Sequence, residues 1–276
     1  MSTDGIASHI PKRRLDAFET IFQVAQLTLR RSLRGWRIWL VALVALIPCG
    51  LAALVRWGGA DAAAQTRLFF SVLSYFHFGI AVPVAAMLFA TAFPWPESNE
   101  GTLTYWFTSP VRRWTVLAGR YAAALVLGLI VLTVTVTAVA LPLTTQPEAD
   151  VAGVTRSAIA ATLLVYPAYL AVFQLVAVVF RFGIVFGVVF VFLENLIAQL
   201  SGAIVQMTLI YYVRSLMLPS IPQKLLTGAA EPANVDPAAT PLTSILVFGC
   251  VTAVALGLSL LLVEVIEYRG RTSQAA

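Results

Sequence analysis

Residues 121–143, "YAAALVLGLIVLTVTVTAVALPL", carry no charged side chain. A helix of about 20 apolar residues crosses the roughly 30 Å hydrocarbon core of a bilayer. The run is apolar throughout, whereas a strand of a membrane barrel alternates apolar and polar residues. The stretch therefore predicts a transmembrane helix.

Five further runs of the same kind flank it, at residues 38–55, 68–93, 157–180, 182–213 and 241–263. The chain is 59% apolar and 11% charged, against roughly 25% charged in an average soluble domain. We therefore expect an all-α membrane protein with a single domain over residues 1–276. Its six transmembrane helices are predicted at 36–56, 68–93, 115–141, 157–180, 183–208 and 241–264, with an external loop at 209–240 that begins with an interfacial helix.

Lysine and arginine are concentrated on one side of these runs. With the N-terminus inside, the cytoplasmic segments hold thirteen of the eighteen basic residues. Cytoplasmic segments of membrane proteins carry such an excess, so both termini and the loop after the second run are expected in the cytoplasm. We expect a multi-pass protein of the bacterial inner membrane, with the lipid bilayer as its surroundings. The basic residues form no soluble domain, so nucleic acid is not an expected partner.

The segment before the first span, within residues 1–35, has the pattern of an amphipathic helix. Apolar residues recur at helical spacing at Phe18, Phe22, Ala25, Leu29 and Leu33, with charged and amide side chains on the other sides. We expect an N-terminal amphipathic interfacial helix on the inner membrane surface. A simple anchoring helix without a partner remains an alternative.

The loop after the second run, residues 97–113, contains both charged and turn-forming residues, which predict a defined local structure. Ser98 or Asn99 can cap a short helix that ends before Pro110, because the residue before a proline is pushed out of helical geometry. Ser109 can then cap a second helix with Pro110 at its first position. Such a structure presents a defined face to the cytoplasm and favours a protein partner.

This loop resembles the cytoplasmic signature of type-2 ABC exporter permeases. The resemblance rests on Glu100-Gly101-Thr102-Leu103, then Ser109-Pro110-Val111-Arg112-Arg113, then Leu117 and Gly119-Arg120-Tyr121. Arg120 stands where a lysine is common in that family, which keeps the charge. The resemblance implies a membrane permease that acts as a dimer, with a second copy or a related permease. It also implies that the loop is a cytoplasmic coupling helix between spans 2 and 3, docking on a separate ATPase subunit through Glu100, Gly101, Thr102, Ser109, Pro110, Arg112 and Arg113.

The positions of the lysines in the sequence favour an ATPase on a separate chain. A Walker A loop needs a lysine after a glycine-rich turn, and the two lysines, Lys12 and Lys224, lie in "HIPKRR" and "IPQKLL". ATP and Mg are therefore expected on an ABC ATPase partner with Walker motifs, and this chain is expected to be neither an enzyme nor a cofactor protein. A loop that merely obeys the positive-inside rule is the alternative.

Glu194 lies 12 residues into the fifth run, or about 18 Å along a helix. A carboxylate at that depth is costly and is a candidate functional group. Asn195, Gln199 and Gln206 follow at helical spacing, and the stripe of Glu194, Asn195, Gln199 and Gln206 is predicted to line a substrate path or, alternatively, to form a polar seam between helices.

Other polar and small residues of the spans have simpler interpretations. Gly183 and Gly187 form a GxxxG pattern that favours close helix packing. His77 is expected to be a hydrogen-bonded core residue, because the chain has no set of ligands for a metal. Glu264 is expected to be solvated where the last span ends.

Two other function classes remain open. An ion-coupled secondary transporter would use Glu194 as its proton site, although the six runs show no clear inverted repeat. A membrane-embedded enzyme would need paired carboxylates, a Cys/His set or a metal cluster, and the sequence shows none with suitable spacing.

Overall fold

Within the residues that the structure describes, the protein is all-helical and has the apolar helices of a multi-pass membrane protein. The computed structural model describes residues 16–58, 68–92, 94, 112–141, 151–200, 203–217, 219 and 239–266, and every regular element within them is a helix. Five helical segments there are long and apolar enough to cross a membrane: Trp36–Leu54, Leu68–Ala90, Arg113–Ala140, Val151–Val179 and Pro241–Val265.

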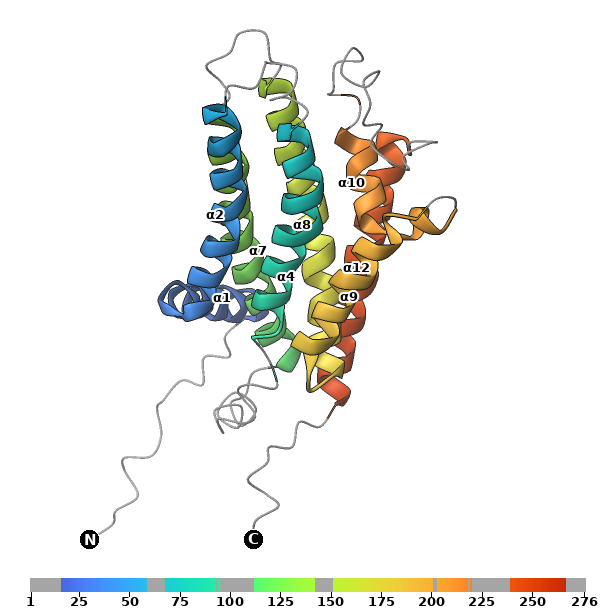
Figure 1. The fold of residues 1–276 in the computed structure, drawn as a ribbon. Helices are drawn as coiled ribbons and strands as arrows, with labels where there is room; N and C mark the ends of the chain where they lie inside the picture. The colour runs from blue at the N-terminus through green and yellow to red at the C-terminus, as the bar shows by residue number, and fades with distance from the viewer. Residues whose placement is uncertain are drawn as a thin grey trace, which may run out of the picture.

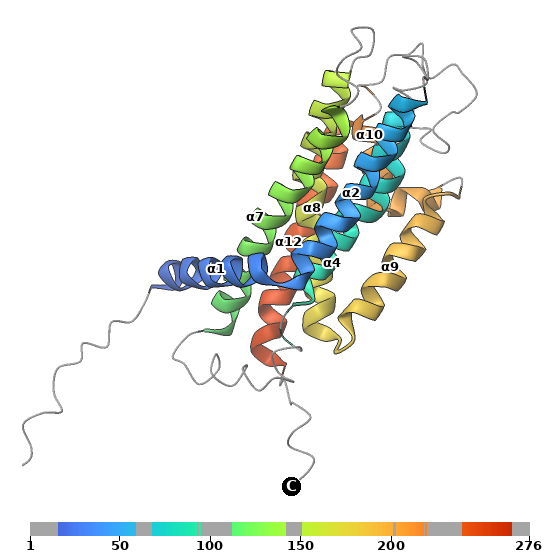
Figure 2. The same ribbon diagram turned by 60° about the vertical axis from the view of Figure 1, so that its left-hand side comes forward.

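The spanning helices stand side by side and a further helix lies across one end of them (Figures 1 and 2). In chain order the elements are α1 (Ala17–Arg34), α2 (Trp36–Trp57), the π-helix η1 (Val72–Ala81), α4 (Val82–Ala90), α7 (Arg113–Ala140), α8 (Val151–Val179), α9 (Gly183–Ile197), the 3-10 helix η3 (Ala203–Met207), α10 (Leu209–Met217) and α12 (Pro241–Val265). The crossing helix is α1. We call this side the α1 end; α7 starts there, and α8 and α12 finish there.

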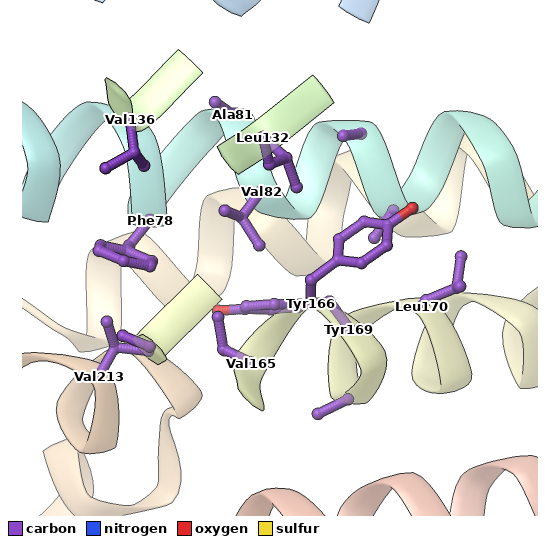
Figure 3. Packing of buried hydrophobic residues seen from close by; sticks show 14 of the residues in the cluster. Phe78, Ala81, Val82, Leu132, Val136, Val165, Tyr166, Tyr169, Leu170 and Val213 are labelled. Carbon is purple, nitrogen blue, oxygen red and sulfur yellow. The ribbon is translucent and has the colours of Figure 1, made fainter. Parts of the chain in front are cut away.

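Helix α8 forms the centre of the bundle. It packs against α7, α4 and α12, and its residues Val165, Tyr166, Tyr169 and Leu170 have no exposed surface. Figure 3 shows these side chains meeting Phe78 and Val82 of the second span, Leu132 and Val136 of α7, and Val213 of α10. The apolar run of α8 is therefore surrounded on several sides, which accounts for a core made of large side chains.

Two tyrosine hydroxyls join α7 to α8 inside this core. Tyr166 donates a hydrogen bond to the Ala124 carbonyl at 2.9 Å, and Tyr121 donates one to the Pro167 carbonyl at 3.0 Å. A side chain at Gly128 would occupy the place of the Tyr166 hydroxyl. The glycine thus allows a large polar ring between the two helices, and each phenol keeps a partner.

The second span combines a π-helix with an α-helix. His77 lies in η1 with no exposed surface, and its Nε2 is 3.2 Å from Thr162 Oγ1 of α8. The Thr162 hydroxyl itself donates to the Ala158 carbonyl at 2.8 Å, so its oxygen accepts the imidazole N–H. The prediction of a hydrogen-bonded core histidine is confirmed.

The predicted helix over residues 183–208 is broken. Helix α9 ends at Ile197, and the chain passes through η3 before α10 begins at Leu209. In Figures 1 and 2, α9 rises from the α1 end and stops part of the way, whereas α10 lies nearer the opposite end. Residues 209–217, which the sequence placed at the start of an external loop, form a mostly buried helix because its apolar face packs on α8, α12 and η1.

The glycines of α9 have the expected packing role. A Cβ at Gly187 would lie 2.7 Å from Met87 Cγ and Sδ, and one at Gly183 would lie 3.2 Å from the Ala177 Cα. The prediction that this GxxxG pattern permits close helix packing is confirmed. A further boundary difference concerns α8, which begins at Val151 instead of residue 157, because Val151 and Val154 are buried against the bundle.

Candidate functional site

The described part of the predicted coupling region is the start of α7. Arg112 is exposed and extended, and its carbonyl accepts hydrogen bonds from Thr115 N at 3.1 Å and Thr115 Oγ1 at 2.6 Å. Arg113 is the first residue of the helix and is half-buried. The predicted helix start at Pro110 is wrong, because Arg112 still has an extended backbone. Glu100, Gly101, Thr102, Ser109 and Pro110 lie outside the described residues.

The start of α7 is capped by a carboxylate from the last span. Trp114 N donates a hydrogen bond to Glu264 Oε1 of α12 at 3.0 Å. The first N–H groups of a helix lack partners within the helix and carry a partial positive charge, so a carboxylate is a suitable acceptor. Glu264 is exposed, so the prediction that it is solvated at the end of the last span is confirmed, and it has the additional role of capping α7.

An apolar group beside this contact joins four helices. Val24 of α1, Val116 and Leu117 of α7, Val178 of α8 and Val263 of α12 pack together and are at most 4% exposed. We call these five residues the junction cluster. It lies at the α1 end, next to Arg112 and Arg113, so the predicted partner-binding loop leads directly into a packed joint.

Gly119 and Tyr121, which belong to the resemblance, have visible roles in this joint. A Cβ at Gly119 would lie 2.7 Å from the Ile21 carbonyl oxygen and 2.8 Å from Val24 Cβ, so only glycine lets α1 approach α7 so closely. Tyr121 fixes α7 to α8 through the Pro167 carbonyl. These two residues therefore hold the helix that follows the loop against α1 and α8.

A second candidate site lies at the break between α9 and α10. Glu194 is 5% exposed, and its Oε1 accepts hydrogen bonds from Leu209 N at 2.8 Å and Ile210 N at 3.4 Å. Its other oxygen, Oε2, is buried without a hydrogen-bond partner among the described residues. The Tyr169 hydroxyl is also buried and makes no hydrogen bond of good geometry among the described residues, but it lies beside this carboxylate as a potential hydrogen-bond donor to it. Glu194 thus caps α10 with one oxygen, and the Tyr169 hydroxyl is a further donor beside the carboxylate.

The rest of the predicted polar stripe separates in space. Asn195 Nδ2 donates to the Gly79 carbonyl at 2.7 Å and to the Val191 carbonyl at 2.9 Å, which ties α9 to η1. Gln199 and Gln206 are exposed and lie beyond the end of α9. The stripe does not continue on one helix, because α9 ends at Ile197.

Arg214 is a polar residue of this region that the sequence pattern did not reveal. It lies within residues 209–240, which the sequence assigned to an external loop, but it is 7% exposed. Its guanidinium carbon lies 4.7 Å from the centre of the Tyr75 ring, and Nη1 donates to the Ala198 carbonyl at 3.3 Å.

No family model matches this chain, and no curated protein matches it.

The residues of the two sites indicate what each could bind. Within the described ranges no group of three or more His, Cys, Asp or Glu side chains is placed to hold a metal ion. The start of α7 offers exposed positive charge on a packed joint, which suits protein contact. The Glu194 break offers a buried carboxylate oxygen, which suits a proton or a hydrogen-bond donor.

Proposed function

We propose that this chain is the membrane-spanning permease subunit of an ATP-driven ABC exporter. The observation that carries the proposal is the joint at the start of α7. There Gly119 and Tyr121, two residues of the family-like signature, fix α7 to α1 and α8 directly after the predicted coupling loop. A loop that only satisfied charge rules would need no such close packing behind it.

In this proposal a separate ATPase subunit with Walker motifs binds ATP and Mg and docks on residues 97–113. Its movement reaches the start of α7 and, through the junction cluster, α1, α8 and α12. Interfaces that are packed at interior density transmit displacements instead of absorbing them. Two copies of the chain, or one copy and a related permease, form the translocation path between them.

The proposed membrane arrangement has six crossings. Helices α9 and α10 together form the fifth, although neither is long enough alone. Broken helices are tolerated in a bilayer where other groups satisfy the freed backbone, and Glu194 does this for Leu209 and Ile210. Both termini and the α1 end face the cytoplasm, with α1 on the inner surface of the bacterial inner membrane.

The test is to purify the chain from its native membrane and identify the co-purifying proteins. A subunit with Walker motifs is expected. Replacing Glu100, Arg112 and Arg113 by glutamine should reduce ATPase binding and ATP-driven transport while thermal unfolding of the spans is unchanged. Arg156→Gln is the matched control, because Arg156 is an exposed arginine on α8, at the opposite end of the bundle. Full co-purification and transport by the triple variant would contradict the docking role.

A second candidate function is an ion-coupled secondary transporter, favoured by Glu194. Its buried Oε2 makes no hydrogen bond of good geometry among the described residues, and the neighbouring donor is the Tyr169 hydroxyl. The carboxylate also lies at a helix break, where transporters often bind coupling ions. Transport by the purified chain alone in liposomes, driven by a proton gradient and abolished by Glu194→Gln, would select this function over the exporter.

A further inference from the structure

Glu264 links two ends of spans that are far apart in the sequence. It lies near the end of α12, and the backbone N–H that it accepts belongs to Trp114, 150 positions earlier in the chain. The proposed docking on residues 97–113 does not include this contact, and neither does the Glu194 break. Its role is therefore a separate question.

The sequence at the start of α7 explains why an outside carboxylate is placed there. Arg112 at the N-cap provides no side-chain hydrogen bond, and the first turn of α7 contains no acidic residue. Arg112 and Arg113 add positive charge to the positive end of the helix dipole, which is unfavourable. The Glu264 carboxylate supplies both the missing acceptor and the missing negative charge.

The neighbouring residue of α12 strengthens the link. Val263 has no exposed surface and packs in the junction cluster with Val116 and Leu117 of α7. The end of α12 thus contacts α7 through apolar packing and through one solvent-exposed, charge-assisted hydrogen bond. Such bonds are stronger and more directional than those between neutral groups.

We propose that Glu264 is a positioning residue that makes the end of α12 move with the start of α7. The role in coupling rests on the proposed function, in which a partner acts on the loop immediately before Arg112. Although α12 packs mainly on α8, this contact, together with Val263, connects it to the first turns of α7, immediately after that loop. Movement at residues 97–113 then reaches the last span without passing through α8.

The link is tested by hydrogen–deuterium exchange of the full chain in lipid nanodiscs. Glu264→Ala should raise the exchange rate of the peptide that covers the start of α7 by about tenfold, the effect of losing one hydrogen bond to a charged acceptor. Glu264→Gln keeps an acceptor oxygen and should show a clearly smaller increase. Val265→Ala is the control, because Val265 is the next residue and is 78% exposed. Unchanged exchange in Glu264→Ala would overturn the link.

The coupling role is tested with the co-purified ATPase in liposomes. Glu264→Ala should keep ATPase binding and basal hydrolysis but lower the substrate moved per ATP by several-fold, and Glu264→Gln should recover part of it. An unchanged ratio alongside faster exchange would overturn the coupling role. If the wild-type chain bound no ATPase, the proposed function and the coupling role would fail together, whereas the exchange result would still decide the link between α12 and α7.

Discussion

Glu194 Oε1 accepts the Leu209 N–H at 2.8 Å, which closes the break between α9 and α10 with a side chain 15 positions away. An unsatisfied N–H is costly in a low-dielectric interior. The carboxylate at this depth is therefore a structural cap for α10, and it interacts in addition with the buried Tyr169 side chain.

Removing this cap should destabilise the protein. Glu194→Ala leaves the Leu209 and Ile210 N–H groups without their acceptor and should lower the free energy of unfolding by about 2–4 kcal/mol. Glu194→Gln should cost about 1 kcal/mol, because an amide oxygen still accepts. Thermal unfolding in nanodiscs measures both. Gln206→Ala is a control at an exposed position of η3, and an equal loss in the control would contradict the capping role.

Gly119 should be intolerant of a methyl group. Gly119→Ala places a Cβ 2.7 Å from the Ile21 carbonyl oxygen, so α1 must shift away from α7 at a cost of about 1–3 kcal/mol. We expect faster hydrogen exchange throughout α1. The control is Gly257→Ala on α12, where no atom lies within 4 Å of the added carbon.

The control substitution should be neutral or stabilising, since alanine favours a helix by up to about 1 kcal/mol over glycine. Equal exchange of α1 in the wild type and in Gly119→Ala would show that the close approach is not needed to hold the two helices together.

The spanning helices could be predicted from the sequence because each is specified by its own continuous run of apolar residues. A continuous apolar run such as residues 121–143 has one stable arrangement in a bilayer, and the structure has a helix over the run as far as Ala140. The break after Ile197 had no comparable signal, since residues 203–213 are nearly as apolar as α9. Helix α10 becomes stable only through long-range contacts, namely the Glu194 cap and packing against α8.

In the candidate sites, too, contacts that depend on a local sequence pattern could be predicted, whereas long-range contacts could not. The spacing of Gly183 and Gly187 predicted close packing, because the pattern itself is the contact surface. The partner of Glu264 could not be predicted, because Trp114 contributes only a backbone N–H that any residue would provide. A hydrogen bond from a backbone N–H does not depend on the donor's side chain, so the sequence does not reveal it.

The Thr162 hydroxyl should stabilise the fold by accepting a hydrogen bond from the buried His77 ring. In Thr162→Val the buried imidazole N–H loses its acceptor, which should reduce the free energy of unfolding by about 1–3 kcal/mol. Thr162→Ser retains the hydroxyl and should lose less than the valine variant. Chemical unfolding monitored by tryptophan fluorescence distinguishes them, and a valine variant as stable as the serine variant would contradict the hydrogen bond.

Gly79 and Asn195 should behave as a coupled pair. A Cβ at Gly79 would lie 2.7 Å from Asn195 Oδ1, while Asn195 Nδ2 donates to the Gly79 carbonyl at 2.7 Å. Gly79→Ala alone should therefore displace the amide, break that bond and destabilise the contact between η1 and α9 by about 1–3 kcal/mol.

A double-mutant cycle isolates this pair. Asn195→Ala loses the bond to Gly79 and should cost about 1 kcal/mol, but it also removes the atom that a new Cβ would strike. Gly79→Ala should then cost little in the Asn195→Ala background, which gives a coupling energy of about 1–2 kcal/mol between the two substitutions. Additive losses in thermal unfolding would mean that Gly79 is needed for the π-helical backbone of η1 itself and not for the approach of Asn195.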